Sequence, residues 1–316
     1  MPLDPHASRL LAILKSAKRP DPDSTGPAEW RQAFAALMRL SGAPERVSFV
    51  EERFLPANLG ALALRLYTPR GLDYALGPGL VYFHGGGFIA GSLETHDAFC
   101  RSLANAGGCR VVAVDYRVAP EHKFPTALLD CYRAASWVKA QAGMLGIDRH
   151  RLAVGGDSAG ASLAAIVCGM ARAAPGPPFA LQLLLCPITD FAASQASRRA
   201  LATGYLLEQR AMERELALYL PAGFNTADPG LSPLHLAELG GLPPACIHTA
   251  EFDPLRDEGK AYAERLKEAG VAVRHTCHSG MIHLFYAMGD AIPYARRALA
   301  VIGEEIRMAL APTRCG

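Results

Sequence analysis

The stretch Leu152-Ala153-Val154-Gly155-Gly156-Asp157-Ser158-Ala159-Gly160 decides the fold, because it sets one serine between two glycines where two elements meet. The apolar run 152–155 predicts a buried strand, and the apolar segment 159–173 predicts the helix that follows it. A turn this sharp brings two backbones together, so glycine is needed on both sides of the serine. A G-x-S-x-G pattern between a strand and a helix is typical of a nucleophile elbow. Ser158 is therefore the candidate nucleophile; the competing interpretation is a glycine-rich turn with a surface serine.

The sequence around the elbow repeats the same alternation of short apolar runs and longer helical segments. The predicted strands are 80–83, 111–115, 152–155, 181–186, 245–249 and 271–275. These runs lack polar alternation, as expected for strands that are covered on both faces. Helical spacing follows at 127–144, 159–173, 255–269 and 294–309. We therefore predict an α/β fold with a mostly parallel central sheet and helices on both faces.

Two further segments interrupt this alternation. Residues 7 to 40 have helical spacing, and residues 47 to 67 are strand-like, with Pro56-Ala57-Asn58-Leu59-Gly60 as a hairpin connection. Residues 191–224 follow a strand but have mixed helical character. We predict that 1–45 and the insertion 191–224 form a helical cap over a catalytic domain of residues 46–316.

Composition excludes several classes of function. The 316 residues carry 32 basic and 30 acidic side chains, a net charge of +2, with no basic run that would hold a phosphate backbone, so nucleic acid is not an expected partner. The eight cysteines are scattered without a metal-ligand spacing, which favours reduced structural thiols. No apolar segment approaches the ~20 residues of a membrane span, and no leader is recognised, so a cytoplasmic location is expected.

A serine hydroxyl needs a base to take its proton, so a histidine is required. His278 and His283 lie in the segment 278–285, expected to be a loop after the last strand and downstream of the serine. His283 is preferred because it is nearer the following helical segment. His96 is placed in an upstream loop.

The acid that orients this base is expected between the serine and the histidine, after a strand. Asp253 directly follows the run 245–249, and Pro254 suits the first position of a helix. Asp190, after the preceding strand, and Asp257, one turn into the helix, are the alternatives.

Backbone donors for a developing oxyanion are expected from His84-Gly85-Gly86-Gly87, at the end of an early strand. Successive glycines leave their N–H groups unobstructed, so that two of them can point at one oxygen. The N–H of Ala159, directly after the serine, is a further donor. His84 itself is interpreted as a residue that braces the loop. Neither G-x-x-x-x-G-K-[ST] nor G-x-G-x-x-G occurs, which argues against a phosphate-binding loop.

Four segments together resemble the hormone-sensitive lipase-like carboxylesterases, the bacterial family IV group of α/β hydrolases. They are His84–Gly87, Asp115-Tyr116-Arg117-Val118-Ala119-Pro120-Glu121, Gly156–Gly160 and Asp253-Pro254-Leu255-Arg256-Asp257, and His283 completes the set. The resemblance covers residues 84 to 283 in the order found in the family. It implies the α/β-hydrolase fold and a triad of Ser158, Asp253 and His283.

The resemblance also implies features outside the triad. Gly86 and Gly87 are the preferred donors to the oxyanion, and Arg117 and Glu121 are expected in structural ion pairs. Members of the family often pair through an edge strand, so a homodimer is expected. The family commonly has glycine after the histidine; this chain has Leu284, which is expected to crowd the substrate pocket.

The predicted function is hydrolysis of short- to medium-chain carboxylic esters through an acyl-enzyme on Ser158. The expected partner is a small-molecule ester, and this chemistry requires neither a metal nor an organic cofactor. The alternatives are an amidase or lactonase with the same three residues, and a small-molecule receptor on a hydrolase scaffold.

Overall fold

The computed structural model describes residues 1–17, 21, 24–56, 61–172, 176, 178–192 and 195–312. The predicted hairpin connection at 56–60 lies outside the described residues, except for Pro56. Within the described chain, no helix is long and apolar enough to cross a membrane.

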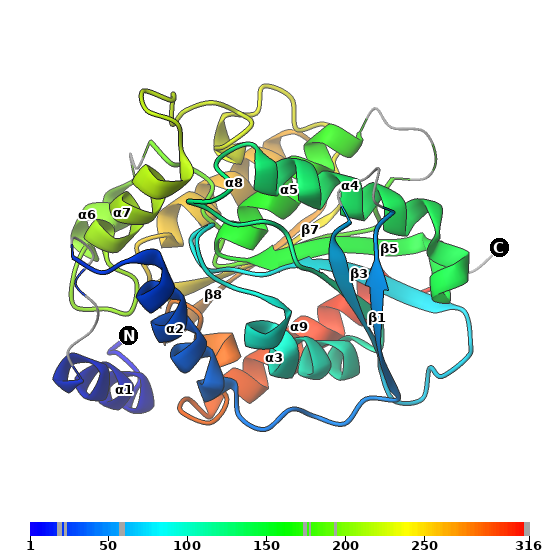
Figure 1. Cartoon of the computed structure of the whole chain (residues 1–316), viewed down its shortest axis with the longest axis horizontal. Coiled ribbons are helices and arrows are strands. Elements are labelled where there is room, and N and C mark those ends of the chain that lie inside the picture. Colours follow the sequence, from blue (N-terminus) through cyan, green and yellow to red (C-terminus); the bar gives the residue numbers. More distant parts are fainter. Residues whose placement is uncertain are drawn as a thin grey trace.

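One eight-stranded sheet runs through the molecule (Figure 1). Its strands are β1 (Phe49–Phe54), β2 (Ala63–Thr68), β3 (Gly77–Phe83), β4 (Arg110–Val114), β5 (Ile147–Asp157), β6 (Gln182–Leu185), β7 (Ala245–Phe252) and β8 (Val273–Ile282). The order across the sheet is β1-β2-β4-β3-β5-β6-β7-β8. The pairs β1–β2 and β2–β4 are antiparallel and all others are parallel, which confirms the mostly parallel sheet.

Helices cover both faces of this sheet. They are α3 (Leu93–Gly107), α4 (Thr126–Ala140), α5 (Ala159–Ala171), α8 (Arg256–Glu268) and α9 (Tyr294–Ala309), with short 3-10 turns η1 (Arg39–Ser41), η3 (Ala142–Leu145), η4 (Pro233–His235) and η5 (Phe285–Ala287). Residues of α4, α5 and α8 belong to one buried cluster, and residues of α3 and α9 belong to the other. The sheet is therefore the middle of three layers.

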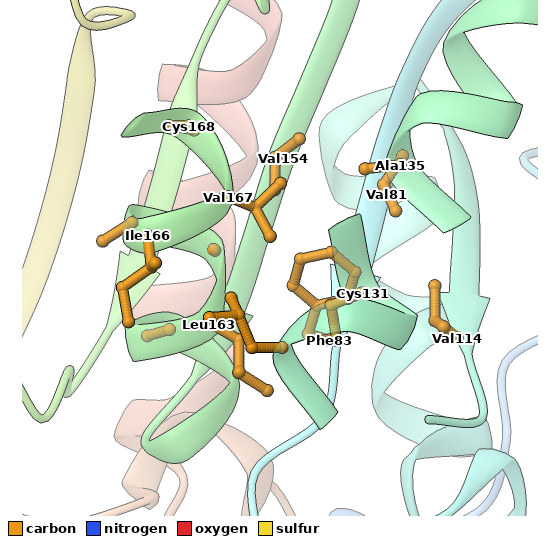
Figure 2. Close-up of a cluster of buried hydrophobic side chains, with 14 of the residues drawn as sticks. Val81, Phe83, Val114, Cys131, Ala135, Val154, Leu163, Ile166, Val167 and Cys168 are labelled. Atoms are coloured by element: carbon orange, nitrogen blue, oxygen red, sulfur yellow. The ribbon is translucent and has the colours of Figure 1, made fainter. Parts of the chain in front are cut away.

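Successive side chains of the central strands enter opposite clusters. Val81 and Phe83 pack with α4 and α5 (Figure 2), whereas Leu80 and Tyr82 face the other helix layer. A strand residue points to the face opposite that of its neighbour. This two-sided burial explains why these strands appear in the sequence as unbroken apolar runs.

Helix α3 and strand β8 differ from the prediction in ways that change the position of a histidine. Helix α3 was not predicted, and His96, placed in a loop from the sequence, lies within it. Strand β8 begins two residues later than expected and extends to Ile282, so His278 is in the strand rather than in a loop. The long register with β7, in which Ala250 pairs with His278, accounts for this extension.

The two segments predicted to form a cap lie against each other. They contain α1 (Pro5–Ser16), α2 (Pro27–Met38), α6 (Ala196–Ala200) and α7 (Gln209–Tyr219), on one side of the molecule in Figure 1. The indole Nε1 of Trp30 in α2 donates to Oε1 of Glu215 in α7 at 3.2 Å. Helix α6 is fixed to α8 by the buried pair of Arg198 and Glu258, with Nε 2.7 Å from Oε2.

The segment 115–121 is braced by ion pairs, as expected. Arg117 makes a forked contact with the buried carboxylate of Asp130, with both distances at 2.8 Å. Glu121 pairs with Arg31 of α2. Arg31 also donates to the carbonyl oxygen of Ile89 at 2.8 Å, so this residue ties the first cap segment to the loop that follows the glycines.

Candidate active site

Ser158 sits at a strained turn between β5 and α5. Its φ of 51° and ψ of −117° are rarely adopted by a residue with a side chain. A Cβ at Gly156 would lie 2.5 Å from the carbonyl oxygen of Phe83, and a Cβ at Gly160 would collide with the same oxygen. The serine N–H is held by the carbonyl oxygen of Leu185 at 2.8 Å. The two glycines therefore let β3, β5 and α5 come together, and the serine is presented at the tip of the turn.

His283 and Asp253 meet Ser158 from the ends of neighbouring strands. His283 follows β8, and its Nε2 lies 3.1 Å from Oγ of Ser158. Its Nδ1 lies 2.7 Å from Oδ2 of Asp253, which follows β7. A carboxylate can only accept, so Nδ1 carries the proton and Nε2 is left to accept from the serine. All three side chains are buried.

The other sequence candidates have different partners. His278 contacts His248 and the hydroxyl of Tyr294, and burial lowers the pKa of His278 to about 4. Asp190 lies 3.0 Å from Nε2 of His235. Asp257 accepts from the backbone N–H of Ser197. The structure thus brings together Ser158, Asp253 and His283.

The glycine loop faces the serine with a conformation that requires glycine. Gly86 has φ of 121° and Gly87 has φ of 61°, and a Cβ at either position would collide with its surroundings. Among the described residues, no acceptor is found for the N–H groups of Gly86, Gly87 or Ala159. Gly85 differs, because its N–H donates to Oδ1 of Asp157 at 2.9 Å. That bond corrects the prediction that included Gly85 among the oxyanion donors.

Asp157 joins the loop to the elbow, a role that the sequence did not reveal. Its buried carboxylate accepts from the hydroxyl of Tyr82 at 2.6 Å as well as from Gly85. Burial by itself raises the pKa of Asp157, but His96 and the hydrogen bonds outweigh it and hold the pKa below its ordinary value. Asp157 therefore fixes the glycine loop relative to its own chain neighbour, Ser158.

His84 braces the same loop. Its Nδ1 donates to the carbonyl oxygen of Gly85 at 2.9 Å, and its ring stacks on Tyr116 with 4.2 Å between the centroids. Its Nε2 is buried, with no partner among the described residues. Burial lowers the pKa of His84 to about 3, so the ring is neutral at ordinary pH.

The buried histidine His84 predicts a loss of stability in acid. Its pKa of about 3 in the fold lies below its ordinary value of 6.5, so the unfolded chain binds the extra proton as pH falls below 6.5. Between pH 7 and pH 4.5 this group should remove about 2.5 kcal/mol from the free energy of unfolding. In a His84→Phe variant, urea unfolding should show a correspondingly smaller change between the two pH values. An identical change in both proteins would contradict the prediction.

Cys186 lies beside the acid. Its Sγ, a carboxylate oxygen of Asp253 and a ring nitrogen of His283 lie within 4.8 Å of one another. Burial, followed by the charge of Asp253, raises the pKa of the Cys186 thiol well above its ordinary value. The thiol is therefore protonated, and the two nitrogens of His283 already face Asp253 and Ser158.

A small cavity of about 70 Å³ opens next to the glycine loop, between the loop and α7. Its wall is mostly apolar, and it is lined by Gly87, Phe88, Ile188, Phe191, Arg198, Gln209, Met212, Glu213, Glu215 and Leu216. Leu284, expected to crowd the substrate pocket, does not line this cavity: it is buried in the cluster below the sheet, with φ of 59°. That left-handed backbone explains why a glycine suits the position.

Comparison with known proteins places this geometry in context. A family model described as alpha/beta hydrolase fold matches residues 80–287. An ethyl acetate hydrolase of Pseudomonas putida is 41% identical over 287 residues, with 89% of each chain covered. The carboxylesterase NlhH of Mycobacterium tuberculosis is 40% identical over 273 residues, covering 84% of this chain and 85% of the relative.

Solved structures agree over nearly the whole chain. An ester-hydrolase from the metagenome of Lake Arreo, complexed with a derivative of bipyridine phosphonate, has a TM-score of 0.94 at 38% identity and covers 98% of this chain and all of the other. A hyperthermophilic esterase from Pyrobaculum calidifontis has a TM-score of 0.92 at 38% identity with the same coverage.

Proposed function

Because this chain belongs to the hormone-sensitive lipase-like carboxylesterases of the α/β-hydrolase family and is a carboxylic ester hydrolase, we propose that Ser158, His283 and Asp253 carry out its reaction. The observation that carries the proposal is the continuous path from Oγ of Ser158 through the ring of His283 to Asp253, at 3.1 and 2.7 Å.

The proposed reaction has two steps. Oγ of Ser158 attacks the ester carbonyl while Nε2 of His283 takes the serine proton. The tetrahedral intermediate collapses when His283 returns that proton to the leaving alcohol, which leaves an acyl group on the serine. Water then loses a proton to Nε2 as it attacks the acyl carbonyl, and His283 returns this proton to Oγ of Ser158 as the acid leaves. Asp253 holds the ring and stabilises its charged form during both steps.

The N–H groups of Gly86, Gly87 and Ala159 are proposed to stabilise the oxyanion. They lie in the glycine loop and at the start of α5, where the helix dipole also favours negative charge. Asp157 and His84 hold the loop in place beforehand, so little reorganisation is needed as charge develops on the substrate oxygen.

A Gly86→Ala change should lower kcat by about 10²- to 10³-fold, the effect of losing one oxyanion donor. Alanine resists the backbone φ of 121°, and its Cβ would collide with the carbonyl oxygen of Ala90, so the loop must shift. The measurement is kcat and KM for p-nitrophenyl butyrate, with circular dichroism as the check of folding. Gly71→Ala is the matched control: it has a φ of 83° and open space around the new Cβ, so it carries similar backbone strain at a surface turn and should retain activity.

The substrates are proposed to be short- to medium-chain esters. The small cavity beside Gly87 and the similarity to an ethyl acetate hydrolase support this range. We further propose that 1–45 and 191–224 act as a cap that bounds the substrate site, supported by the contact of Trp30 with Glu215. A homodimer formed through an edge strand stays a prediction.

Rates for p-nitrophenyl esters of increasing acyl length test the substrate range. We expect kcat/KM to be highest between acetate and octanoate, and a maximum at palmitate would contradict the proposal.

Matched anilides and lactones in the same assay compare ester cleavage with amide and lactone cleavage. A fluorophosphonate probe should label the native enzyme on Ser158, as identified by peptide mass.

A further inference from the structure

Glu215 places a carboxyl group where ester hydrolysis does not require one. It projects from α7 against the glycine loop, so closely that a Cβ at Gly87 would overlap the carboxylate. It lines the cavity beside the loop. The N–H of Gly87 is one of the proposed oxyanion donors, so Glu215 is close to the position proposed for the substrate carbonyl.

The surroundings of this carboxyl group are mainly apolar. Phe88, Ile188 and Leu216 are among the cavity walls. Burial raises the pKa of Glu215 to about 7, only partly opposed by Trp30 and His283. A polar group in such a place costs free energy unless it is hydrogen-bonded.

The carboxyl group has acceptor capacity to spare. The hydrogen bond found for it among the described residues comes from Nε1 of Trp30 to Oε1. A carboxylate has about four lone-pair sites on its two oxygens. Arg198, the cation in the same cavity wall, is engaged with Glu258. A substrate group with a donor would therefore find an unused acceptor in this cavity.

We propose that Glu215 is a specificity-determining residue that selects esters carrying a hydrogen-bond donor, a hydroxyl or an amino group, on the part of the substrate that enters this cavity. The inference rests on the proposed function of the triad. The donor can lie on the acyl side or on the alcohol side of the ester, and both give the same chemistry at Glu215. A substrate carboxylate in this place is disfavoured, because two acidic groups would meet.

The test compares two pairs of esters. In each pair, a hydroxyl group of one ester is replaced by a methyl group in the other. On the acyl side the pair is ethyl 3-hydroxybutanoate and ethyl 3-methylbutanoate. On the alcohol side it is 2-hydroxyethyl butanoate and propyl butanoate. For each pair the ratio of kcat/KM values is measured in wild type, Glu215→Gln, Glu215→Leu and Trp30→Phe, and a general loss of activity cancels in each ratio.

In wild type we expect the hydroxy ester to be preferred by about tenfold in one of the two pairs, which identifies the side of the ester that enters the cavity. Glu215→Leu should lower that ratio by ten- to a hundredfold, because the acceptor is replaced by an apolar group. Glu215→Gln keeps an acceptor oxygen and should retain part of the preference. Trp30→Phe removes the partner but not the carboxyl group and should keep the ratio.

Three results would overturn the inference. The first is a ratio that is the same in wild type and in Glu215→Leu for both pairs, which would leave Glu215 as a structural partner of Trp30. The second is a wild-type preference for the methyl ester in both pairs. The third is a fall of the ratio in Trp30→Phe as large as in Glu215→Leu. Failure of the triad proposal is distinguished separately, because the fluorophosphonate would then not label Ser158.

Discussion

Replacing Ser158 by alanine is expected to lower kcat for p-nitrophenyl butyrate by about 10⁴- to 10⁶-fold. The hydroxyl oxygen of Ser158 lies 3.1 Å from Nε2 of His283, and it is the only hydrogen-bond partner of Nε2 found among the described residues. Without it no acyl-enzyme forms, and the donors of the oxyanion site are left with slow attack by water. The residue remains small and keeps its backbone bond to Leu185, so the fold should persist.

The measurement combines kinetics with labelling and thermal unfolding. Ser158→Ala should lose labelling by the fluorophosphonate while its Tm stays within a few degrees of wild type. Ser162→Ala is the matched control, because this serine lies one turn further along α5 and its Oγ donates to the carbonyl oxygen of Ile188. Labelling that persists in Ser158→Ala, or disappears in Ser162→Ala, would contradict the assignment.

Asp253→Asn should lower kcat by about 10⁴-fold, although the side chain barely changes in size. Oδ1 of Asp253 accepts from the backbone N–H of Leu255 at 2.9 Å, and Oδ2 faces Nδ1 of His283. In the asparagine variant the Leu255 N–H needs an acceptor, so the amide oxygen of the side chain faces it. The amide NH₂ then points at Nδ1 of His283. Nδ1 must then accept, and the ring proton moves to Nε2, where it faces Ser158. The histidine can no longer take the serine proton.

The check is kcat together with the rate of fluorophosphonate labelling, which should fall in parallel because both need an activated serine. Asp190→Asn is the control, since Asp190 was the main alternative acid and contacts His235 instead. The kcat of Asp190→Asn, calculated per folded protein, should stay within tenfold of the wild-type value. Comparable losses in the two variants would mean that the acid has been assigned wrongly.

The sequence predicted the family, the ester hydrolase class and the central fold, and the comparisons confirm all three. The strands were recognisable because both of their faces are buried, so that each central strand is a short apolar block. Helix α3 was not predicted, because its apolar residues, such as Phe99 and Leu103, are separated by polar ones. Its start carried a local signal, the capping box of Ser92 and Thr95.

The three residues of the triad were predictable because serine, acid and histidine occur in a fixed order along the chain in this fold. Ser158 had a local motif, and Asp253 and His283 follow it after successive strands, so the structure brings together the three residues chosen. Chain order alone did not rank Gly86 above Gly85, and only the family resemblance did so. The carboxylate that accepts from the Gly85 N–H belongs to Asp157, 72 positions away. Glu215 lies in a cap segment without a motif, and nothing in its neighbours along the chain indicates that it reaches the glycine loop.

The hydrogen bond between Asp157 and Gly85 makes the elbow and the glycine loop one unit, and α7 lies outside this unit. The elbow and the glycine loop are joined through the buried side chain of Asp157, whose partners Tyr82 and Gly85 lie in β3 and in the loop that follows it. We therefore expect redesign of α7, including Glu215, to alter which esters are accepted without changing the geometry of the triad. For directed evolution, libraries should vary α7 and keep Asp157, Tyr82 and the paired glycines of the elbow unchanged.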